Sequence, residues 1–347
     1  NYRLLGYTSD KRQITIGSSM LKNTEGDTIL DLEDVLEKWM EPLEPIFPTK
    51  ADCPGNVRLF TCDKGANGSN GVTGGPRHAG IAKPRIFIPV FPGTNCEYDT
   101  AKAFENAGGI PEVFVVRNLT PKDIDETIRE MKERISKSQI VMLPGGFSAG
   151  DEPDGSGKFI ATAFRNPYIR EAVQELLNNR DGLMLGICNG FQALIKLGLA
   201  PYGEIRDIRP DNPTLTFNTI GRHASCMVYT RIASNKSPWF SNVKAGDIHT
   251  IAISHGEGRF VASEAEIEAL AAKGQIATQY VDPEGNPALD IRYNPNGSMF
   301  AIEGITSPDG RVLGKMGHSE RKGKNVCGNV PGEKDQKLFE AGVQYFG

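Results

Sequence analysis

The sequence predicts an α/β protein with an open, mostly parallel sheet flanked by helices, and with added strands in its carboxyl-terminal half. Between residues 85 and 199, short apolar segments alternate with longer segments of helical periodicity. These short segments are apolar throughout, which is typical of strands buried on both faces of a parallel sheet. After residue 200 the segments have more β character. Together these patterns indicate a parallel sheet that is extended by later strands.

The expected elements follow one another in a regular order. The four strands of the first part are RIFIPV (85–90), EVFVV (112–116), QIVMLP (139–144) and GLMLGI (182–187). The helices are expected in CEYDTAKAFENAGG (96–109), TPKDIDETIREMKERI (120–135), FIATAFRNPYIREAVQELLNN (159–179) and GFQALIKLGL (190–199). Thr120 is the expected N-cap of the second helix, with Pro121 at its first position. Later strands are expected in HASCMVYTRI (223–232), DIHTIAIS (247–254), MFAIEGITS (299–307) and GRVLGKMG (310–317), before a closing helix in 333–346.

The first 84 residues differ from the rest in composition. Segments 3–10 and 12–20 alternate like a short strand pair, and 27–47 has helical periodicity with Asp31 or Asp34 as a candidate cap. This piece has too few apolar residues for a core of its own. Residues 51–84 are rich in glycine and lack the GxxxxGK[ST] pattern of a phosphate-binding loop, so we interpret them as a linker. The main domain is therefore expected to span residues 85–347.

Composition narrows the class of protein. The chain has 347 residues and a net charge of −4, which gives no electrostatic reason to expect nucleic acid or an anionic membrane as a partner. No apolar segment is long enough to cross a bilayer, and no signal peptide opens the sequence. The six cysteines include no CxxC pair, so no metal site is predicted. Reduced thiols and a cytoplasmic location are expected.

The clearest chemical signal is the segment from Gly186 to Gly190, which has the form G-x-C-x-G. It is the thiol counterpart of a nucleophile elbow, in which two glycines allow a sharp strand-to-helix turn that exposes the central residue. Cys188 is therefore a candidate nucleophile, and the Asn189 N–H at the start of the helix is a candidate donor to an oxyanion. The alternative is a buried structural cysteine, which is the usual environment of a free thiol.

A thiol nucleophile needs a base, and the base needs an orienting group. Two histidines have a carboxylate two residues later: His255 with Glu257, and His318 with Glu320. Residues i and i+2 of an extended segment share a face, so either pair could act. We favour His318 and Glu320, because they follow an expected strand, whereas SHGEGRF is glycine-rich and better suited to backbone contacts with a ligand.

Three unusual segments follow expected strands of the parallel sheet: FPGTNCE, PGGFSAGD and CNG. The carboxyl ends of parallel strands meet at one edge of a sheet, where functional groups gather. The second segment offers Gly146, whose missing side chain would let its N–H approach a substrate as the second oxyanion donor.

The sequence also resembles a known family. PVFPGTNCEYDTAKAFENAGG, PGGFSAGD, LGICNGFQ, HGEGRF, YNPNGS and GHSER occur in the same order as in the glutaminase domain of phosphoribosylformylglycinamidine synthase, a class I glutamine amidotransferase. The resemblance covers about residues 85 to 320. The elbow alone would specify only the wider class, whereas FPGTNCE, HGEGR and NPNGS together point to this family.

The resemblance implies a flavodoxin-like class I glutaminase fold and a role for each matching residue. The implied triad is Cys188, His318 and Glu320, and the implied oxyanion hole is Gly146 with Asn189. The implied substrate-binding residues are Phe147, Gln192, His255, Gly256 and Glu257. The family usually has Tyr where Ala149 stands and Pro where Ser319 stands. The second departure removes a rigid spacer between His318 and Glu320.

The implied reaction is hydrolysis of glutamine through a cysteine thioester. The ammonia would supply an ATP-dependent synthase that converts formylglycinamide ribonucleotide (FGAR) to its amidine (FGAM) in purine biosynthesis. No cofactor is implied for this chain, whereas ATP and Mg²⁺ are expected in the synthase portion. Residues 1–50 resemble the end of that portion in the large single-chain form, which would make the synthase a partner within the same polypeptide. Two alternatives remain: a cysteine hydrolase or peptidase of the related superfamily, and a non-catalytic regulatory domain with the same fold.

Overall fold

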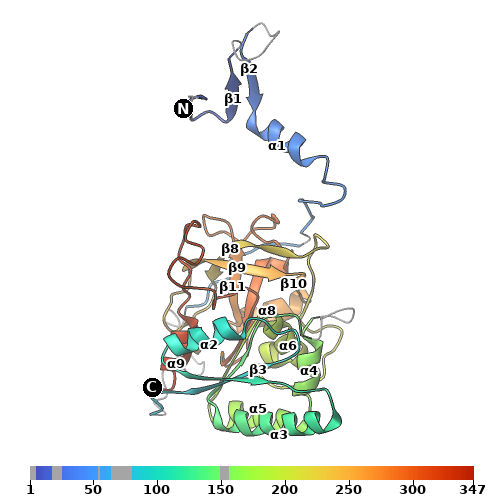
Figure 1. Ribbon diagram of the computed structural model, residues 1–347, viewed down its shortest axis with the longest axis vertical. Coiled ribbons are helices and arrows are strands. Elements are labelled where there is room, and N and C mark those ends of the chain that lie inside the picture. Colours follow the sequence, from blue (N-terminus) through green and yellow to red (C-terminus); the bar gives the residue numbers. More distant parts are fainter. Residues whose placement is uncertain (1–4, 18–25, 54, 64–79, 149–155) are drawn as a thin grey trace. The chain divides into compact units, whose positions relative to one another are not determined.

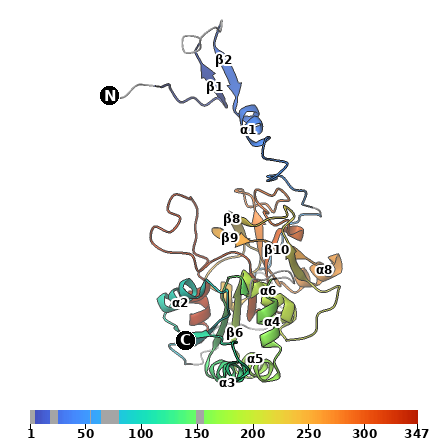
Figure 2. The ribbon, with the colours of Figure 1, turned by 45° about the vertical axis from the view of Figure 1, so that its right-hand side comes forward.

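The computed structural model describes residues 5–17, 26–53, 55–63, 80–148 and 156–347. The contacts within the chain divide it into two compact units, Asn1–Ala51 and Asp52–Gly347. The larger unit contains the α/β fold (Figures 1 and 2). In the described part of the chain, no helix is both long enough and apolar enough to cross a membrane.

The larger unit is built on one sheet with a parallel and an antiparallel half. The parallel strands lie in the order β4-β3-β5-β6-β13, and the antiparallel strands continue it as β12-β11-β8-β9. The parallel strands are β3 (Arg85–Val90), β4 (Ile110–Val115), β5 (Ile140–Leu143), β6 (Leu183–Ile187) and β13 (Val312–Lys315). The antiparallel strands are β8 (Ala224–Ile232), β9 (Ile248–His255), β11 (Ile276–Val281) and β12 (Ile302–Thr306). Numbered along the chain, the parallel half has the 2-1-3-4-5 order of flavodoxin-like folds, which confirms the predicted fold class.

Helices cover both faces of the parallel half. Figure 1 shows α2 (Glu97–Asn106) and α9 (Leu338–Gln344) on one side of β3, with α3 (Pro121–Lys137) and α5 (Pro167–Asn178) on the other. As predicted, Thr120 caps α3 in a capping box with Asp123. The remaining elements are α4 (Lys158–Phe164), α6 (Asn189–Leu197), α7 (Leu199–Tyr202), α8 (Glu264–Ala272), the 3₁₀ turns η3 (Pro238–Phe240) and η4 (Met299–Ala301), and the strand pair β7 (Thr214–Phe217) and β10 (Glu257–Val261).

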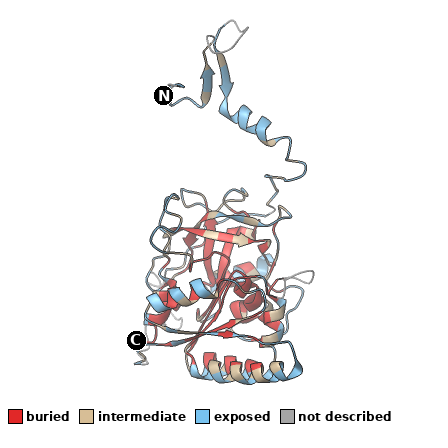
Figure 3. Ribbon diagram, viewed as in Figure 1, coloured by how far each residue is buried: buried red, intermediate tan, exposed pale blue. Residues whose placement is uncertain are grey.

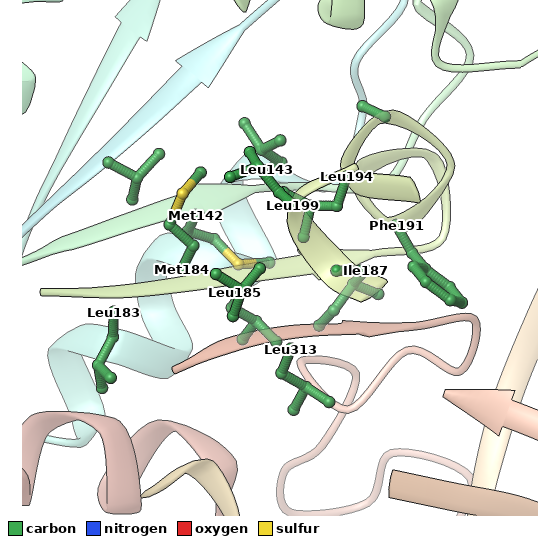
Figure 4. Close-up of a cluster of buried hydrophobic side chains, with 14 of the residues drawn as sticks. Met142, Leu143, Leu183, Met184, Leu185, Ile187, Phe191, Leu194, Leu199 and Leu313 are labelled. Atoms are coloured by element: carbon green, nitrogen blue, oxygen red, sulfur yellow. The ribbon is translucent and has the colours of Figure 1, made fainter. Parts of the chain in front are cut away.

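The core lies where β6 passes between its neighbours, and Figure 3 shows the sheet strands as mostly buried. All five residues of β6 are buried. Figure 4 shows side chains of β5, β6, α6, α7 and β13 packed against one another, among them Leu143, Leu185, Phe191, Leu199 and Leu313. The strand that leads to Cys188 is therefore held rigidly on both faces.

Several elements differ from their predicted extents. The expected helix 159–179 is two helices, because α4 ends before Asn166 and that side chain caps α5 with Pro167 at its first position. The closing helix begins only at Leu338. Neither β11 nor the pair formed by β7 and β10 was predicted, although Gly274 and DPEGNP flank β11 and PDNP precedes β7.

The smaller unit contains β1 (Gln13–Ile16), β2 (Thr28–Asp31) and α1 (Leu32–Met40). The expected partner of β1 in residues 3–10 is wrong, since β1 pairs with β2 and the described part of that segment forms no strand. Because Thr28–Asp31 form β2, the expected helix 27–47 begins only after Asp31. The side chain of Asp31 caps this helix. No residue of α1 is buried.

Residues 55–63 belong to the larger unit and pack against the rest of it, although the sequence suggested a linker in 51–84. Phe60 is buried, and its carbonyl accepts a hydrogen bond of 2.9 Å from Nη1 of Arg231. Cys62 forms a parallel bridge with Ser234. Most of the glycine-rich segment, residues 64–79, lies outside the described residues, as does the end of PGGFSAGD from Ala149 onward.

Candidate active site

The segments singled out in the sequence meet at the carboxyl edge of the parallel strands. Cys96 follows β3, Gly145 follows β5, Cys188 follows β6, and His318 follows β13. These four strands are consecutive neighbours in the sheet. Residues from four separate parts of the chain therefore surround one point.

Cys188 occupies the strained turn that its flanking glycines predict. Its backbone has φ 52° and ψ −107°, and α6 begins at the next residue. A side chain at Gly190 would lie 1.9 Å from the carbonyl oxygen of Leu143, so only glycine lets α6 approach β5 this closely. The sulfur is almost fully buried, 3.6 Å from the carbonyl oxygen of Ser254.

His318 and Glu320 form a buried pair beside this cysteine. Nδ1 of His318 lies 2.6 Å from Oε1 of Glu320. The backbone N–H of His318 donates a 2.8 Å hydrogen bond to the carbonyl of Ala252 in β9. Burial favours the neutral imidazole, but the charge of Glu320 and hydrogen bonds with Cys188, Cys96 and Glu320 together raise the pKa of His318 well above its ordinary value. Burial likewise opposes the charge of Glu320, but His318 lowers the pKa of that carboxyl. The pair therefore favours an imidazolium next to the thiol.

Gly145 lies between the thiol and the imidazole. A Cβ placed on it would be 2.8 Å from Cε1 of His318, 3.1 Å from Sγ of Cys96 and 3.5 Å from Cβ of Cys188. Cys188 and His318 can therefore face each other only because this position carries no side chain.

Sequence reasoning assigned no role to Cys96, yet it lies inside the site. Its sulfur is buried, 3.9 Å from Nδ1 of His318, and Nη2 of Arg321 donates to it across 3.4 Å. The available signal was its position, since Cys96 belongs to the FPGTNCE segment that follows the first parallel strand. Among the described residues, Cys96, His318 and Glu320 also have the donor types of a metal site, but His318 and Glu320 are already bonded to each other through Nδ1 and Oε1.

The loop after β5 is held from two sides. The Phe147 N–H donates to the carbonyl of Gly93 at 2.9 Å, and the Ser148 N–H donates to Oδ1 of Asn189 at 3.3 Å. Gly146 has φ +147° and forms an antiparallel bridge with Thr94, but its own N–H makes no backbone hydrogen bond within the described residues. The loop thus presents a backbone donor beside the amino end of α6.

The alternative pair of His255 and Glu257 is not formed. Both ring nitrogens of His255 lack a hydrogen-bond partner among the described residues. Oε2 of Glu257 instead accepts a 2.9 Å hydrogen bond from the Ser156 N–H. Burial, with smaller effects from His318 and His223, lowers the pKa of His255 to about 3, so its ring is neutral. His318 is therefore the histidine whose geometry suits a base.

The other residues implied in substrate binding surround this centre. Gln192 lies on α6, where its carboxamide bonds to Nδ2 of Asn189 and to the carbonyl of Glu257. The carbonyl of Gly256 accepts from the Asn218 N–H at 2.9 Å. Phe147 is half exposed, with its ring centre 6.0 Å from that of His223.

Ser319 stands where the resembled family usually has proline, and its hydroxyl forms a hydrogen bond. Oγ of Ser319 donates a 2.6 Å hydrogen bond to Oε1 of Gln336, and Nε2 of Gln336 donates to Oγ1 of Thr230 at 3.2 Å. This bond restrains the spacer between His318 and Glu320 in place of a proline ring.

Comparison with known proteins shows the family of this chain. Residues 83–346 match the family described as CobB/CobQ-like glutamine amidotransferase domain. The chain is 32% identical over 248 residues to the phosphoribosylformylglycinamidine synthase subunit PurQ of Aquifex aeolicus, covering 72% of this chain and 95% of the relative. It is 35% identical over 264 residues to the same subunit of Symbiobacterium thermophilum, covering 75% and 96%. A chain in the structure of PurLQS from Thermotoga maritima superimposes with a TM-score of 0.55 at 26% identity, over 76% of this chain and 100% of that chain.

A family match over most of the chain, together with relatives covered almost end to end, confirms the predicted enzyme class. The chain therefore belongs to the family of the PurQ subunits of phosphoribosylformylglycinamidine synthase and is a glutamine amidotransferase.

Proposed function

We propose that this chain hydrolyses glutamine through a thioester on Cys188. His318 takes the thiol proton as the sulfur attacks the side-chain amide carbon, and it gives that proton to the departing ammonia. Water, deprotonated by His318, then hydrolyses the thioester to glutamate. The observation that carries the proposal is a cysteine on a strained elbow beside a buried His318–Glu320 pair at 2.6 Å.

Glu320 orients the imidazole in this mechanism. Its charge supports the raised pKa of His318, which favours proton transfer from Cys188 to the ring. The N–H groups of Gly146 and Asn189 are the proposed oxyanion donors, because Gly146 belongs to the loop after β5 and Asn189 begins α6 directly after Cys188. Losing one such donor costs about 3 to 4 kcal/mol of transition-state stabilisation. Phe147, Gln192, His255, Gly256 and Glu257 are proposed to line the glutamine site.

The proposed acceptor of the ammonia is an FGAM synthase active site, where ATP and Mg²⁺ activate FGAR. The PurQ relatives support this proposal because each is described as a subunit of phosphoribosylformylglycinamidine synthase. We further propose that residues 1–50 are the end of a synthase portion in the large single-chain form, working in the cytoplasm. The exposed helix α1 is consistent with this proposal, since it buries no residue within its own unit.

The first test is trapping of the nucleophile. A glutamine-mimicking electrophile should label Cys188 in peptide mapping, and Cys188→Ala should abolish glutamine hydrolysis while the circular dichroism spectrum is unchanged. Cys226→Ser is the control, because Cys226 is an exposed thiol and its loss should leave both hydrolysis and labelling intact. Labelling at Cys96 or Cys226 in the parent chain would contradict the assignment.

The second test concerns the acceptor. Glutamine hydrolysis by this chain should accelerate when a separately made synthase portion, ATP and FGAR are added, because docking can favour the productive conformation of the Gly146 loop. Equal rates with and without these additions would rule out this coupling. Cleavage of peptides in place of free glutamine would favour the hydrolase alternative.

A further inference from the structure

A second buried ion pair lies beside Gly317, the residue that precedes His318. Lys315 of β13 lies opposite Gly304 in the antiparallel ladder, and its Nζ reaches the preceding residue of β12, Glu303, at 3.2 Å from Oε1. Both side chains are completely buried. Burying two charges costs several kcal/mol for each ion, and well-packed apolar side chains in their place often give equal or greater stability. The pair therefore calls for an explanation other than stability.

The hydrogen bonds of this pair converge on one residue, Gly317. Its N–H donates to Oε1 of Glu303 at 2.6 Å, and its carbonyl accepts from Nζ of Lys315 at 2.7 Å. The other carboxylate oxygen of Glu303 accepts from the hydroxyl of Thr278. Both backbone groups of Gly317 are thus held by buried charges, in bonds roughly twice as strong as neutral ones.

Gly317 has no room for a side chain of its own. A Cβ there would lie 2.8 Å from Cγ2 of Ile251, and 3.0 Å from both Oε1 of Glu303 and Nζ of Lys315. The ion pair therefore occupies the space beside this backbone and fixes the peptide that leads into His318.

We propose that Glu303 and Lys315 are positioning residues for His318, which they hold through Gly317 without touching the reacting atoms. His318 is then held at three points. Gly317 anchors the preceding peptide, the carbonyl of Ala252 accepts from the backbone N–H of His318, and Glu320 holds Nδ1 of the ring. The backbone pairing of β12 and β13 continues to Met316, whose N–H donates to the carbonyl of Glu303, and the two charged side chains then hold the next residue, Gly317. This inference rests on the proposed role of His318 as base.

The test uses double variants of the full chain that remove the charges together, because leaving one buried charge unpaired would destabilise the fold. Glu303→Leu with Lys315→Met removes the contacts to Gly317. Glu303→Gln with Lys315→Met keeps an acceptor for the Gly317 N–H. Glu303→Asp keeps the charge but shortens its reach, and it serves as the second variant if the first does not fold. All are checked by circular dichroism and thermal unfolding.

We expect the Leu/Met variant and Glu303→Asp to lower kcat for glutamine hydrolysis about ten- to hundredfold at nearly unchanged KM, because displacements of about 1 Å can cost this much. The Gln/Met variant keeps an acceptor for the Gly317 N–H but loses the Lys315 donor, so its kcat should fall less than that of the Leu/Met variant. The low-field NMR signal of the proton between His318 and Glu320 should shift in the Leu/Met variant and in Glu303→Asp, and should shift less in the Gln/Met variant.

The matched control is Arg311→Met, at the opposite end of β13. Arg311 pairs with Asp181 at 3.3 Å and with Asp309 at 2.7 Å, so its loss should lower the melting temperature and leave kcat and the NMR signal unchanged. A folded Leu/Met variant or Glu303→Asp with the parent kcat and an unshifted signal would overturn the proposal. A parent chain that hydrolyses no glutamine, with or without the synthase, would instead contradict the proposed function itself.

Discussion

Gly145 and His318 approach each other so closely that a single methyl group would not fit between them. A Cβ on Gly145 would lie 2.8 Å from Cε1 of His318, which is closer than carbon atoms normally come without bonding. Gly145 has no positive φ, so a side chain there would meet only this steric conflict and no backbone strain.

Gly145→Ala should therefore displace the imidazole and lower kcat for glutamine hydrolysis about ten- to hundredfold, while the fold is retained. Steady-state kinetics and circular dichroism would measure the two effects. The control is Gly328→Ala, whose Cβ would meet nothing closer than 3.8 Å, so its kinetics should match the parent. An unaltered kcat in Gly145→Ala would mean that the imidazole does not need its observed position.

Gly146→Ala tests the proposed oxyanion donor. Its φ of +147° disfavours an L side chain, and a Cβ would lie 2.6 Å from the backbone of Thr94. The loop must then rotate the Gly146 N–H away from the substrate, which should lower kcat about a hundred- to thousandfold. Labelling of Cys188 by an alkylating agent that forms no oxyanion should continue. A parallel loss of labelling would show that the thiol, and not the donor, is affected.

Glu320→Gln should reduce stability most strongly between pH 4.5 and 6.5, the ordinary pKa values of the two groups. The folded chain raises the pKa of His318, so its protonated form adds stability that is complete below 6.5 and is lost as pH rises through the raised value. It lowers the pKa of Glu320, whose charge adds stability that is complete above 4.5 and is lost as pH falls through the lowered value. Urea unfolding at a series of pH values should show a loss of about 3 kcal/mol in this window. A difference independent of pH would contradict the charged pair.

His255→Gln should make the chain less sensitive to acid. The folded state lowers the pKa of His255 from 6.5 to about 3, so the unfolded chain binds more protons between these values. Stability should therefore fall as pH drops through this window, by up to about 1.4 kcal/mol per pH unit. Unfolding between pH 4 and 7 should show a shallower slope for His255→Gln than for the parent. An equal slope in the parent and in His255→Gln would contradict the prediction.

The centre of the site could be predicted because its chemistry is local in sequence. Gly186 and Gly190 mark the turn at Cys188, and the i, i+2 spacing brings Glu320 to His318. The parallel order of strands also follows from local alternation of apolar and helical segments. These signals do not depend on distant parts of the chain.

What the sequence did not reveal depends on contacts between distant segments. Lys315 and Glu303 looked like ordinary polar residues of expected strands, because nothing local shows that β12 and β13 are both enclosed. Cys96 lies beside His318 in the fold, although 222 positions separate the two residues in the sequence. Asp31 was one of two candidate caps, but TILD was still assigned to the helix, because nothing local shows that this segment pairs with β1 as a strand.

The last parallel strand, β13, also determines when the site can exist during synthesis. The nucleophile at 188 leaves the ribosome 318 − 188 = 130 residues before its base, an interval of roughly 6 to 26 s at about 5 to 20 residues per second. Throughout that time β6 lacks the neighbour that fills the centre of the sheet. A nascent or truncated chain thus carries a thiol without its imidazole, and glutamine is spared until the whole domain has been made.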